Sequence, residues 1–278
     1  MRKEEKNYLE EYTTSGGLHL RHAIDPAPED RYFQMHVHNE CEIFCFLAGY
    51  SEYLVEGARY PLERGSVLIM RPSESHRTRI IRSGRYERFT MNFPVNAMDA
   101  LDPQRRLLRP FLDRPLGVGN LYRPGELQGA DALHLFEHLF GIADPYERQM
   151  QANLTLASLL RSVNEAFERR SGDLTPLQTL AGQILAYINA HLFEELSIDL
   201  LAEHFFISRS QVGRLVREAT GSSPWKYITL KRVTAARELI RSGVSVSDAA
   251  NRCGFGDYSA FYRTYVSCFG CSPREDRT

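Results

Sequence analysis

Four side chains in the first third of the chain have types and spacing suited to binding a ligand. His36, His38 and Glu42 have the same parity, so one continuous strand would direct all three to the same face. His76, on a later stretch, could join them. Three imidazoles and a carboxylate suit zinc, iron or manganese, and they also suit hydrogen bonds to a polar organic molecule. Histidines with a purely structural role are the third interpretation.

The surrounding sequence has short β-rich segments separated by Gly and Pro. The segments span 33–38, 42–49, 51–57, 58–63, 65–72, 76–81 and 86–93, which predicts a β-sandwich or barrel. Aromatic faces stack on sugars, and arginines bind carboxylates or phosphates. We therefore predict a pocket for a small polar molecule, a sugar or an organic acid, lined by His36, His38, Glu42, Phe44, Tyr53, His76, Arg77, Arg79 and Arg88. A one-residue slip in register would exchange inward and outward side chains.

The last eighty residues contain a helix-turn-helix pattern twice, over 198–221 and 246–270. In the first copy, Ser208 and Gln211 have the spacing of a capping box. In the second, Asp257 caps a helix that carries Phe261 and Tyr265 on its inner face. The copies are offset by 48 residues, so two recognition helices could enter major grooves about 34 Å apart on one face of DNA.

Two helical stretches, 125–142 and 146–170, lie between these regions. The second has apolar residues at helical spacing, which pack either on the chain's own barrel or on a second subunit: Met150, Leu154, Ala157, Leu160, Val163 and Phe167. Ser171–Asp173 is the predicted boundary, dividing the chain into domains 1–170 and 171–278, with the helix that begins the second domain over 176–193. The fold class is α+β with two domains.

The charge distribution separates the two domains. Residues 199–278 carry twelve Lys and Arg against eight Asp and Glu, whereas the rest of the chain carries 22 against 27. Positive charge in the helix-turn-helix half favours binding to DNA phosphates. Without an apolar run of about 18 residues or a signal segment after Met1, we expect a cytoplasmic protein that does not interact with membranes.

These features closely resemble the AraC/XylS family of bacterial transcription regulators. The chain departs from the family pattern at Val216, Val266 and Asp276. The residues that are characteristic of the family occur in this chain as Leu201-Ala202, Ser208, Gly221, Pro224, Tyr227, Arg232, Ala236, Ala249-Ala250, Gly254-Phe255, Asp257, Ser259, Phe261, Arg263, Gly270 and Ser272-Pro273.

The N-terminal part resembles a cupin barrel. His36, His38 and Glu42, followed by Gly49, resemble the first cupin motif, and Gly65, Pro72 and His76 resemble the second. Together the two resemblances imply a cupin-like sensor barrel with dimerisation helices, followed by two helix-turn-helix units. They also imply a ligand-responsive regulator, expected to be an activator, with no catalytic residues, no cofactor and no metal in its sensor.

The resemblance places Ser210 and Arg214 where base edges are usually read, with Gln211 beside them. On the second recognition helix the outward residues are Tyr258, Ser259, Tyr262 and Arg263. Arg209, Arg217, Lys226, Lys231 and Arg252 are phosphate candidates. The expected partners are double-stranded promoter DNA, RNA polymerase, a small-molecule effector and a second copy of the chain.

Two other functions fit the same residues. A metal-dependent cupin enzyme fused to a DNA-binding tail would lose both metal and activity when His38 is replaced. A DNA-binding protein that needs no ligand would show no thermal stabilisation by any sugar, acid or phosphate, because a ligand that binds the native state must stabilise it.

Overall fold

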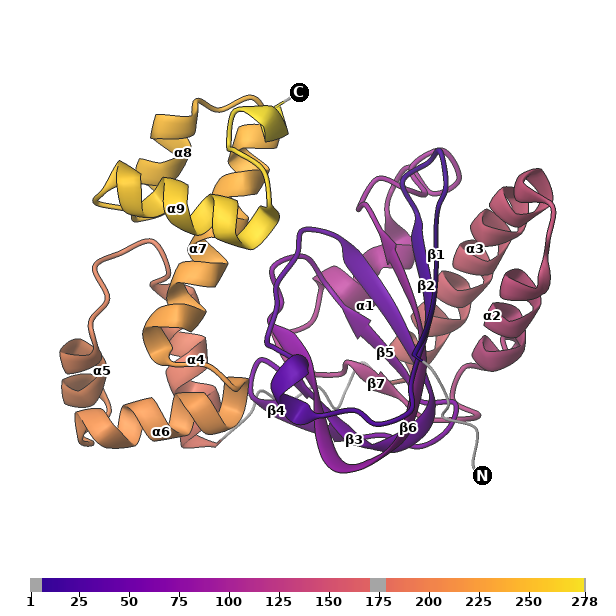
Figure 1. Cartoon of the computed structure of the whole chain (residues 1–278), viewed down its shortest axis with the longest axis horizontal. Helices are drawn as coiled ribbons and strands as arrows, with labels where there is room; N and C mark the ends of the chain where they lie inside the picture. Colours follow the sequence, from indigo (N-terminus) through magenta and orange to yellow (C-terminus); the bar gives the residue numbers. More distant parts are fainter. Residues whose placement is uncertain (1–6, 171–178, 278) are drawn as a thin grey trace.

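The computed structural model describes residues 7–170 and 179–277, which form an N-terminal sheet domain and a C-terminal helical domain (Figure 1). All strand pairs are antiparallel, in the order β1-β2-β6-β3-β5-β7, with β4 paired to β3. The strands are β1 (Tyr8–Thr13), β2 (His19–Asp25), β3 (Cys41–Val55), β4 (Ala58–Pro61), β5 (Val67–Met70), β6 (His76–Phe93) and β7 (Leu121–Tyr122).

Strands β3 and β6 are the long central pair of the sheet. They pair from Cys41 opposite Phe93 to Val55 opposite His76, with shifts in register between Phe46 and Ser51. Such irregularities bend a strand and increase its twist. The predicted segments 42–49 and 51–57 therefore form one irregular strand, as do 76–81 and 86–93.

The two faces of the sheet have different apolar clusters, because side chains alternate along β3. Ile43 and Cys45 belong to the cluster beneath α2 (Ala132–Gly141) and α3 (Pro145–Arg170), whereas Phe44 and Phe46 belong to a cluster on the other face. Figure 1 shows α2 and α3 on the side of the sheet away from the helical domain. The second face is therefore the one available for a pocket.

The helix predicted over 146–170 is confirmed as α3, but its apolar residues divide into two sets. Leu160 and Val163 are buried against the sheet, whereas Met150 and Leu154 are exposed. The helix predicted over 125–142 begins later, at Ala132, where the Asp131 side chain accepts a hydrogen bond from the His134 backbone N–H.

The strand predicted over 33–38 is wrong. Within it, only His36 has a β-bridge, to His76. This stretch follows a short 3₁₀ helix, η1 (Asp30–Tyr32), so its residues reach the sheet as a loop. Strands β1, β2 and β7 were not predicted, nor were the short helices η2 (Arg106–Leu108) and α1 (Arg109–Leu112).

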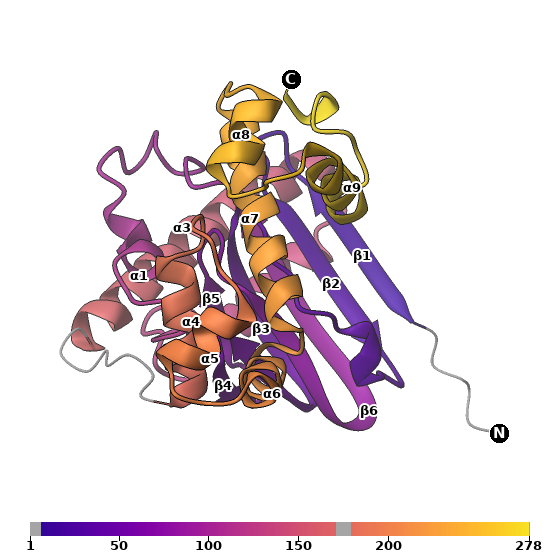
Figure 2. The same ribbon diagram turned by 90° about the vertical axis from the view of Figure 1, so that its left-hand side faces the viewer.

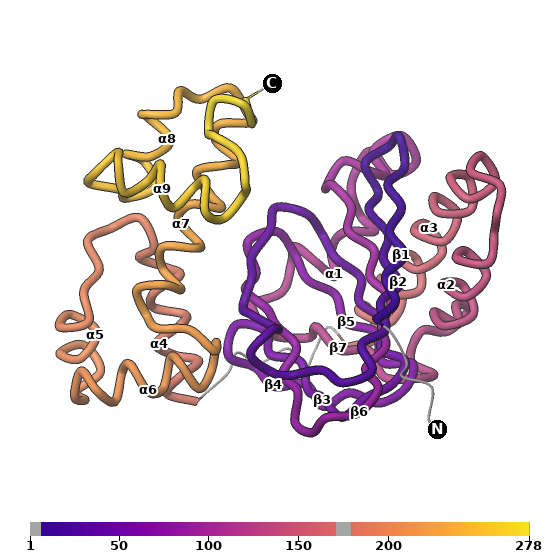
Figure 3. The backbone as a smooth tube through the Cα atoms, viewed as in Figure 1, coloured from indigo at the N-terminus to yellow at the C-terminus, as the bar shows by residue number. Residues whose placement is uncertain are grey.

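The C-terminal domain has one helix-turn-helix unit on each side of a long helix, α7 (Pro224–Arg241), which crosses in front of the sheet in Figure 2 and joins the two units in Figure 3. The other elements are α4 (Leu180–Ala190), α5 (Ile198–His204), α6 (Arg209–Thr220), α8 (Val246–Arg252), α9 (Tyr258–Phe269) and η3 (Glu275–Arg277). The predicted boundary at Ser171–Asp173 lies outside the described residues.

The 48-residue offset between the two units is confirmed by their turns. The Ile207 N–H donates to the Ala202 carbonyl, and the Phe255 N–H donates to the Ala250 carbonyl, each at 3.0 Å. Both predicted caps are present, because Ser208 accepts from the Gln211 N–H and Asp257 accepts from two backbone N–H groups. Within residues 7–170 and 179–277, every helix is too short or too polar to cross a membrane.

Candidate ligand pocket and DNA-reading helices

A cavity of about 350 Å³ lies between β2, β3, β6 and the loop that precedes β3. Six of the predicted pocket residues line it: His36, His38, Glu42, Phe44, Tyr53 and Arg88. The remaining lining residues are His19, Arg21, Tyr32, Phe33, Gln34, Glu40, Thr78, Thr90 and Asn92. The wall is therefore mixed, with several aromatic rings and many hydrogen-bonding groups.

The predicted cluster is assembled at this cavity without a continuous strand. His36, His38, Glu42 and His76 each contribute one donor atom, and these four atoms lie within 4.8 Å of one another. His36 and His38 come from the loop, Glu42 from the start of β3 and His76 from the start of β6. The bridge between His36 and His76 brings the loop to the strand.

Glu42 is the anionic centre of this cluster. Its Oε2 accepts hydrogen bonds from His38 Nε2 at 3.0 Å and from Asn92 Nδ2 at 2.9 Å. Burial alone raises the pKa of Glu42, but the neighbouring His38 and His76 imidazoles hold it well below its usual value. Glu42 is therefore a carboxylate at neutral pH.

The histidines respond differently to the same surroundings. Burial lowers the pKa of His38, but the Glu42 carboxylate more than compensates and raises it overall. Desolvation by the surrounding protein and the nearby His76 ring lower the pKa of His36 to about 3, although part of the residue is exposed at the cavity. His36 is therefore neutral at physiological pH.

Arg77 and Arg79 were predicted in the pocket, and the structure contradicts both assignments. They alternate with His76 and Thr78 along β6, so their side chains point to the face of the strand opposite the cavity. Arg77 pairs with Asp30, and Arg79 Nη1 lies 2.7 Å from Glu52 Oε1.

The alternation of side chains along β6 that excludes these arginines also predicts two pocket residues that were missed. Thr90 and Asn92 follow Arg88 at steps of two on β6, and all three line the cavity. The register of β2, which brings Arg21 opposite Thr90, could not be read locally.

A buried ion pair fixes the turn before His76. The Arg114 guanidinium contacts both oxygens of Glu74 at 2.7 Å, and both side chains are fully buried. The Glu74 backbone carbonyl in turn accepts from His76 Nδ1 at 2.8 Å. Removing either charge would leave the other unpaired in the interior. Arg114 was not recognised in the sequence, because its partner is forty residues away.

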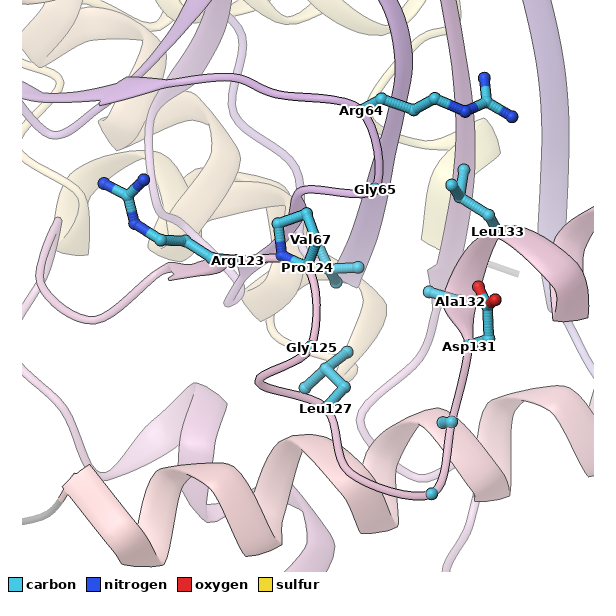
Figure 4. A pocket seen from close by; sticks show the side chains of 12 residues that line it. Arg64, Gly65, Val67, Arg123, Pro124, Gly125, Leu127, Asp131, Ala132 and Leu133 are labelled. Atoms are coloured by element: carbon cyan, nitrogen blue, oxygen red, sulfur yellow. The ribbon is translucent and has the colours of Figure 1, made fainter.

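A second cavity, of about 440 Å³, lies between the turn before β5 and the start of α2. Figure 4 shows the guanidinium groups of Arg64 and Arg123 extending in opposite directions from it. Arg64 pairs with Glu137 and Arg123 with Glu63, at 3.5 and 3.4 Å. Its arginines therefore already have acidic partners.

Helices α6 and α9 present the predicted base-reading residues. Ser210, Arg214, Tyr258, Ser259, Tyr262 and Arg263 are exposed, and Gln211 is half-buried. Arg214 Nη1 lies 3.1 Å from Glu218 Oε1, one turn along the same helix. A guanine edge would compete with Glu218 for this guanidinium.

Four phosphate candidates are also exposed: Arg209, Arg217, Lys226 and Arg252. Arg209 pairs with Asp199 in the same unit. The prediction that Lys231 contacts a phosphate is wrong. Only 2% of Lys231 is exposed, and its Nζ lies 2.6 Å from Glu56 Oε1 in the sheet domain. In this arrangement Lys231 cannot reach a phosphate.

The Glu56–Gly57 turn between β3 and β4 docks on the helical domain. Besides Lys231, Glu56 accepts hydrogen bonds from Asn189 of α4 and Tyr227 of α7. A Cβ atom at Gly57 would lie 2.8 Å from Leu185 Cδ1. Glu56 has φ +46°, which is unfavourable for a residue with a side chain. A strained residue that makes the central contact of an interface suggests a functional role.

The loop that carries the pocket histidines also contacts the helical domain. Met35 packs in the apolar cluster formed by α4 to α7, and Asn39 Nδ2 donates to the Thr234 carbonyl at 3.2 Å. His36 and His38 lie between them and line the cavity. A movement of these histidines would therefore act on a segment that is held by the helical domain.

Comparisons with known proteins match the sheet domain and the helical domain separately. Residues 19–163 match a model described as AraC-like ligand binding domain, and residues 201–278 match one described as helix-turn-helix domain. The chain is 27% identical over 276 residues to the HTH-type transcriptional activator RhaS of Escherichia coli O139:H28, covering 92% of this chain and 91% of RhaS. RhaS of Enterobacter sp. strain 638 is 38% identical over 96 residues, 34% of each chain.

Solved structures resemble the chain over one domain or both. The DNA-binding domain of AdpA, in complex with a target DNA, is 31% identical over 35% of this chain and 88% of that chain, with a TM-score of 0.34. ToxT from Vibrio cholerae is 10% identical over 92% of this chain and 97% of that chain, with a TM-score of 0.40.

Proposed function

Because the chain belongs to the AraC/XylS family of transcription regulators, we propose that it activates transcription from specific promoters in response to a small polar ligand. The observation that supports this function best is the pair of helix-turn-helix units on α7, with exposed candidate base-reading side chains on α6 and α9. Two such units on one rigid helix can contact two successive major-groove segments. RNA polymerase is the proposed partner in activation.

The proposed effector is a sugar, with an organic acid as the alternative, bound in the 350 Å³ cavity. Phe44 and Tyr53 supply aromatic surface, while Arg21, Arg88 and Asn92 can bind hydroxyls or a carboxylate. A thermal-shift screen of sugars and organic acids tests this, because binding to the native state raises the melting temperature. Replacing Arg88 by Ala should abolish the shift for a ligand that uses it.

The effector signal is proposed to reach DNA through the interface between the domains. The loop with His36 and His38 contacts α7 through Asn39, and the Glu56 carboxylate accepts from the Ser75 N–H at 2.7 Å, one residue before His76. The pocket and the helical domain thus share two backbone segments. A ligand changes the equilibrium only if it binds one arrangement of these segments more tightly than another.

A homodimer is proposed through the outer face of α3. Tyr146, Met150 and Leu154 are 77%, 52% and 57% exposed, and they follow one another at steps of four. Such a spacing forms one stripe along a helix, and the opposite side of α3 is already buried on the sheet. A dimer presents four recognition helices, so the spacing of half-sites can contribute to promoter selection.

A further inference from the structure

We propose that His36, His38, Glu42 and His76 bind one first-row divalent transition-metal ion at the wall of the ligand cavity. Their four donor atoms already lie within 4.8 Å of one another. A metal ion at the centre of such a set is about 2.0–2.2 Å from each nitrogen or oxygen, which requires the donors to be close together. Only small side-chain movements are needed to reach that geometry.

The backbone orients all three imidazoles for this role. A carbonyl oxygen can only accept, so a ring nitrogen beside one must carry the hydrogen, and the other nitrogen of a neutral ring keeps its lone pair. In each of these histidines Nδ1 faces a carbonyl, so Nε2 points into the cluster. A metal ion there would displace the hydrogen that His38 Nε2 donates to Glu42. The contacts are His36 to Gln34 at 3.2 Å, His38 to Glu40 at 3.0 Å and His76 to Glu74 at 2.8 Å. Metal-binding histidines typically donate their second nitrogen in this way.

Two buried groups of the cluster, His76 and Glu42, are suited to bind a cation. His76 Nε2 has no hydrogen-bond partner within the part of the chain that the structure describes, and it lies 3.7 Å from Glu42 Oε2. The Glu42 side chain is buried, and its hydrogen-bond donors in that same part are His38, Tyr53 and Asn92. A buried carboxylate is stabilised by a cation or by hydrogen-bond donors. A divalent ion between Glu42 and His76 would satisfy both.

The donor set selects the class of metal. Three imidazole nitrogens and one carboxylate suit Mn²⁺, Fe²⁺, Co²⁺, Ni²⁺ or Zn²⁺, whereas Ca²⁺ and Mg²⁺ prefer oxygen ligands alone. A six-coordinate ion would keep two positions for other ligands. Because His36, His38 and Glu42 also line the cavity, an oxygen of the effector could fill such a position. This last point rests on the proposed function, and metal binding itself does not.

The test is titration of the metal-stripped full-length protein with Co²⁺, followed by visible absorption and by equilibrium dialysis. We expect one Co²⁺ per chain, with d–d bands, and affinity at least about tenfold weaker in His36→Gln and His38→Gln. His134→Gln is the matched control, because His134 and His138 form an exposed pair on α2 that could bind metal incidentally. Circular dichroism establishes that each variant is folded.

Two results would overturn the proposal. One is wild-type protein that binds no stoichiometric Co²⁺. The other is Co²⁺ binding that is unchanged in the folded His36→Gln and His38→Gln variants. Loss of binding in His134→Gln, with both pocket variants unaffected, would place the metal on α2 and overturn the proposal in the same way. Neither effector nor DNA enters this experiment, so failure of metal binding is distinguishable from failure of the regulatory function. DNA binding measured on the same stripped protein completes that distinction.

Discussion

Lys231 of α7 and Glu56 of the β3–β4 turn form an ion pair that joins the two domains, with 2.6 Å between Nζ and Oε1. Both residues are at least 95% buried. Burial and the Glu56 carboxylate raise the pKa of Tyr227 well above its usual value, so Tyr227 remains a neutral donor to the same carboxylate. The sheet and α7 therefore share one buried polar network.

Replacing Lys231 by Met should leave the buried Glu56 side chain without its cationic partner, which costs about 3–5 kcal/mol in buried pairs. We expect a lower melting temperature and loss of any effect of the ligand on DNA binding, since the domains would separate. Calorimetry and fluorescence anisotropy measure the two effects. Lys226→Met, on the exposed side of α7, should leave stability unchanged.

The double variant Glu56→Gln with Lys231→Met gives a sharper result. Without the carboxylate, no buried charge lacks a partner, so the double variant should be more stable than Lys231→Met alone. Equal or lower stability of the double variant would contradict the assigned role of the pair.

Replacing Leu154 by Glu should convert a dimer to a monomer in size-exclusion chromatography with light scattering. The change adds a charge in the middle of the exposed α3 stripe and removes no contact with the sheet. Asn153→Glu, an exposed change one residue away, should leave the dimer intact. A wild-type protein that is monomeric at micromolar concentration would remove the basis for this assignment.

Asp276 is one of the positions at which the chain departs from the family pattern, and its side chain contacts several residues of the helical domain. Its carboxylate pairs with Arg237 and Arg241 and accepts a hydrogen bond from Tyr265 at 2.8 Å. Although burial opposes ionisation, these partners lower the pKa of Asp276 to about 2.

The lowered pKa gives a stability contribution that is complete above the unfolded value of 3.8 and is lost as pH falls through about 2. Asp276→Asn should therefore reduce the free energy of unfolding by about 1–2 kcal/mol at pH 7. Urea denaturation of both proteins from pH 7 to 3 should show the difference shrinking below about pH 4. A difference independent of pH would mean that the charge of Asp276 is not involved.

Arg252 and Lys226 are exposed, and each is predicted to contact one phosphate. Replacing either by Ala should weaken binding to all DNA sequences alike and reduce the slope of log K against log salt by about 0.9. Lys231→Met should leave that slope unchanged, because Lys231 is turned toward Glu56. Anisotropy at several salt concentrations measures all three slopes.

The sequence predicted the helical domain better than the sheet, for a physical reason. Capping by Ser208 and Asp257 involves residues two or three positions away, so a local pattern contains all the information. The partner of Lys231 is 175 residues away, and nothing near Lys231 distinguishes it from an exposed phosphate-binding lysine. Charge alone therefore led to the wrong assignment.

In the pocket, residue types were predicted more reliably than side-chain directions. The His36, His38, Glu42 and His76 cluster forms as expected, although two of its members lie on a loop and not on a strand. Arg77 was wrongly assigned to the pocket because the alternation of side chains was considered for His36, His38 and Glu42 but not along β6. The parity of β6 was available in the sequence, whereas the register of β2 against β6 required the fold.

The most direct test of the account is DNA binding to the chain's own upstream region and to neighbouring promoters, measured by footprinting and by competition with unrelated DNA. We predict protection of two successive major-groove segments per subunit. Arg214→Ala should lower specific affinity by about 1–3 kcal/mol and leave non-specific binding nearly unchanged. Binding that unrelated DNA competes away equally, with no footprint and no effect of Arg214→Ala, would contradict the proposal that α6 and α9 read a sequence.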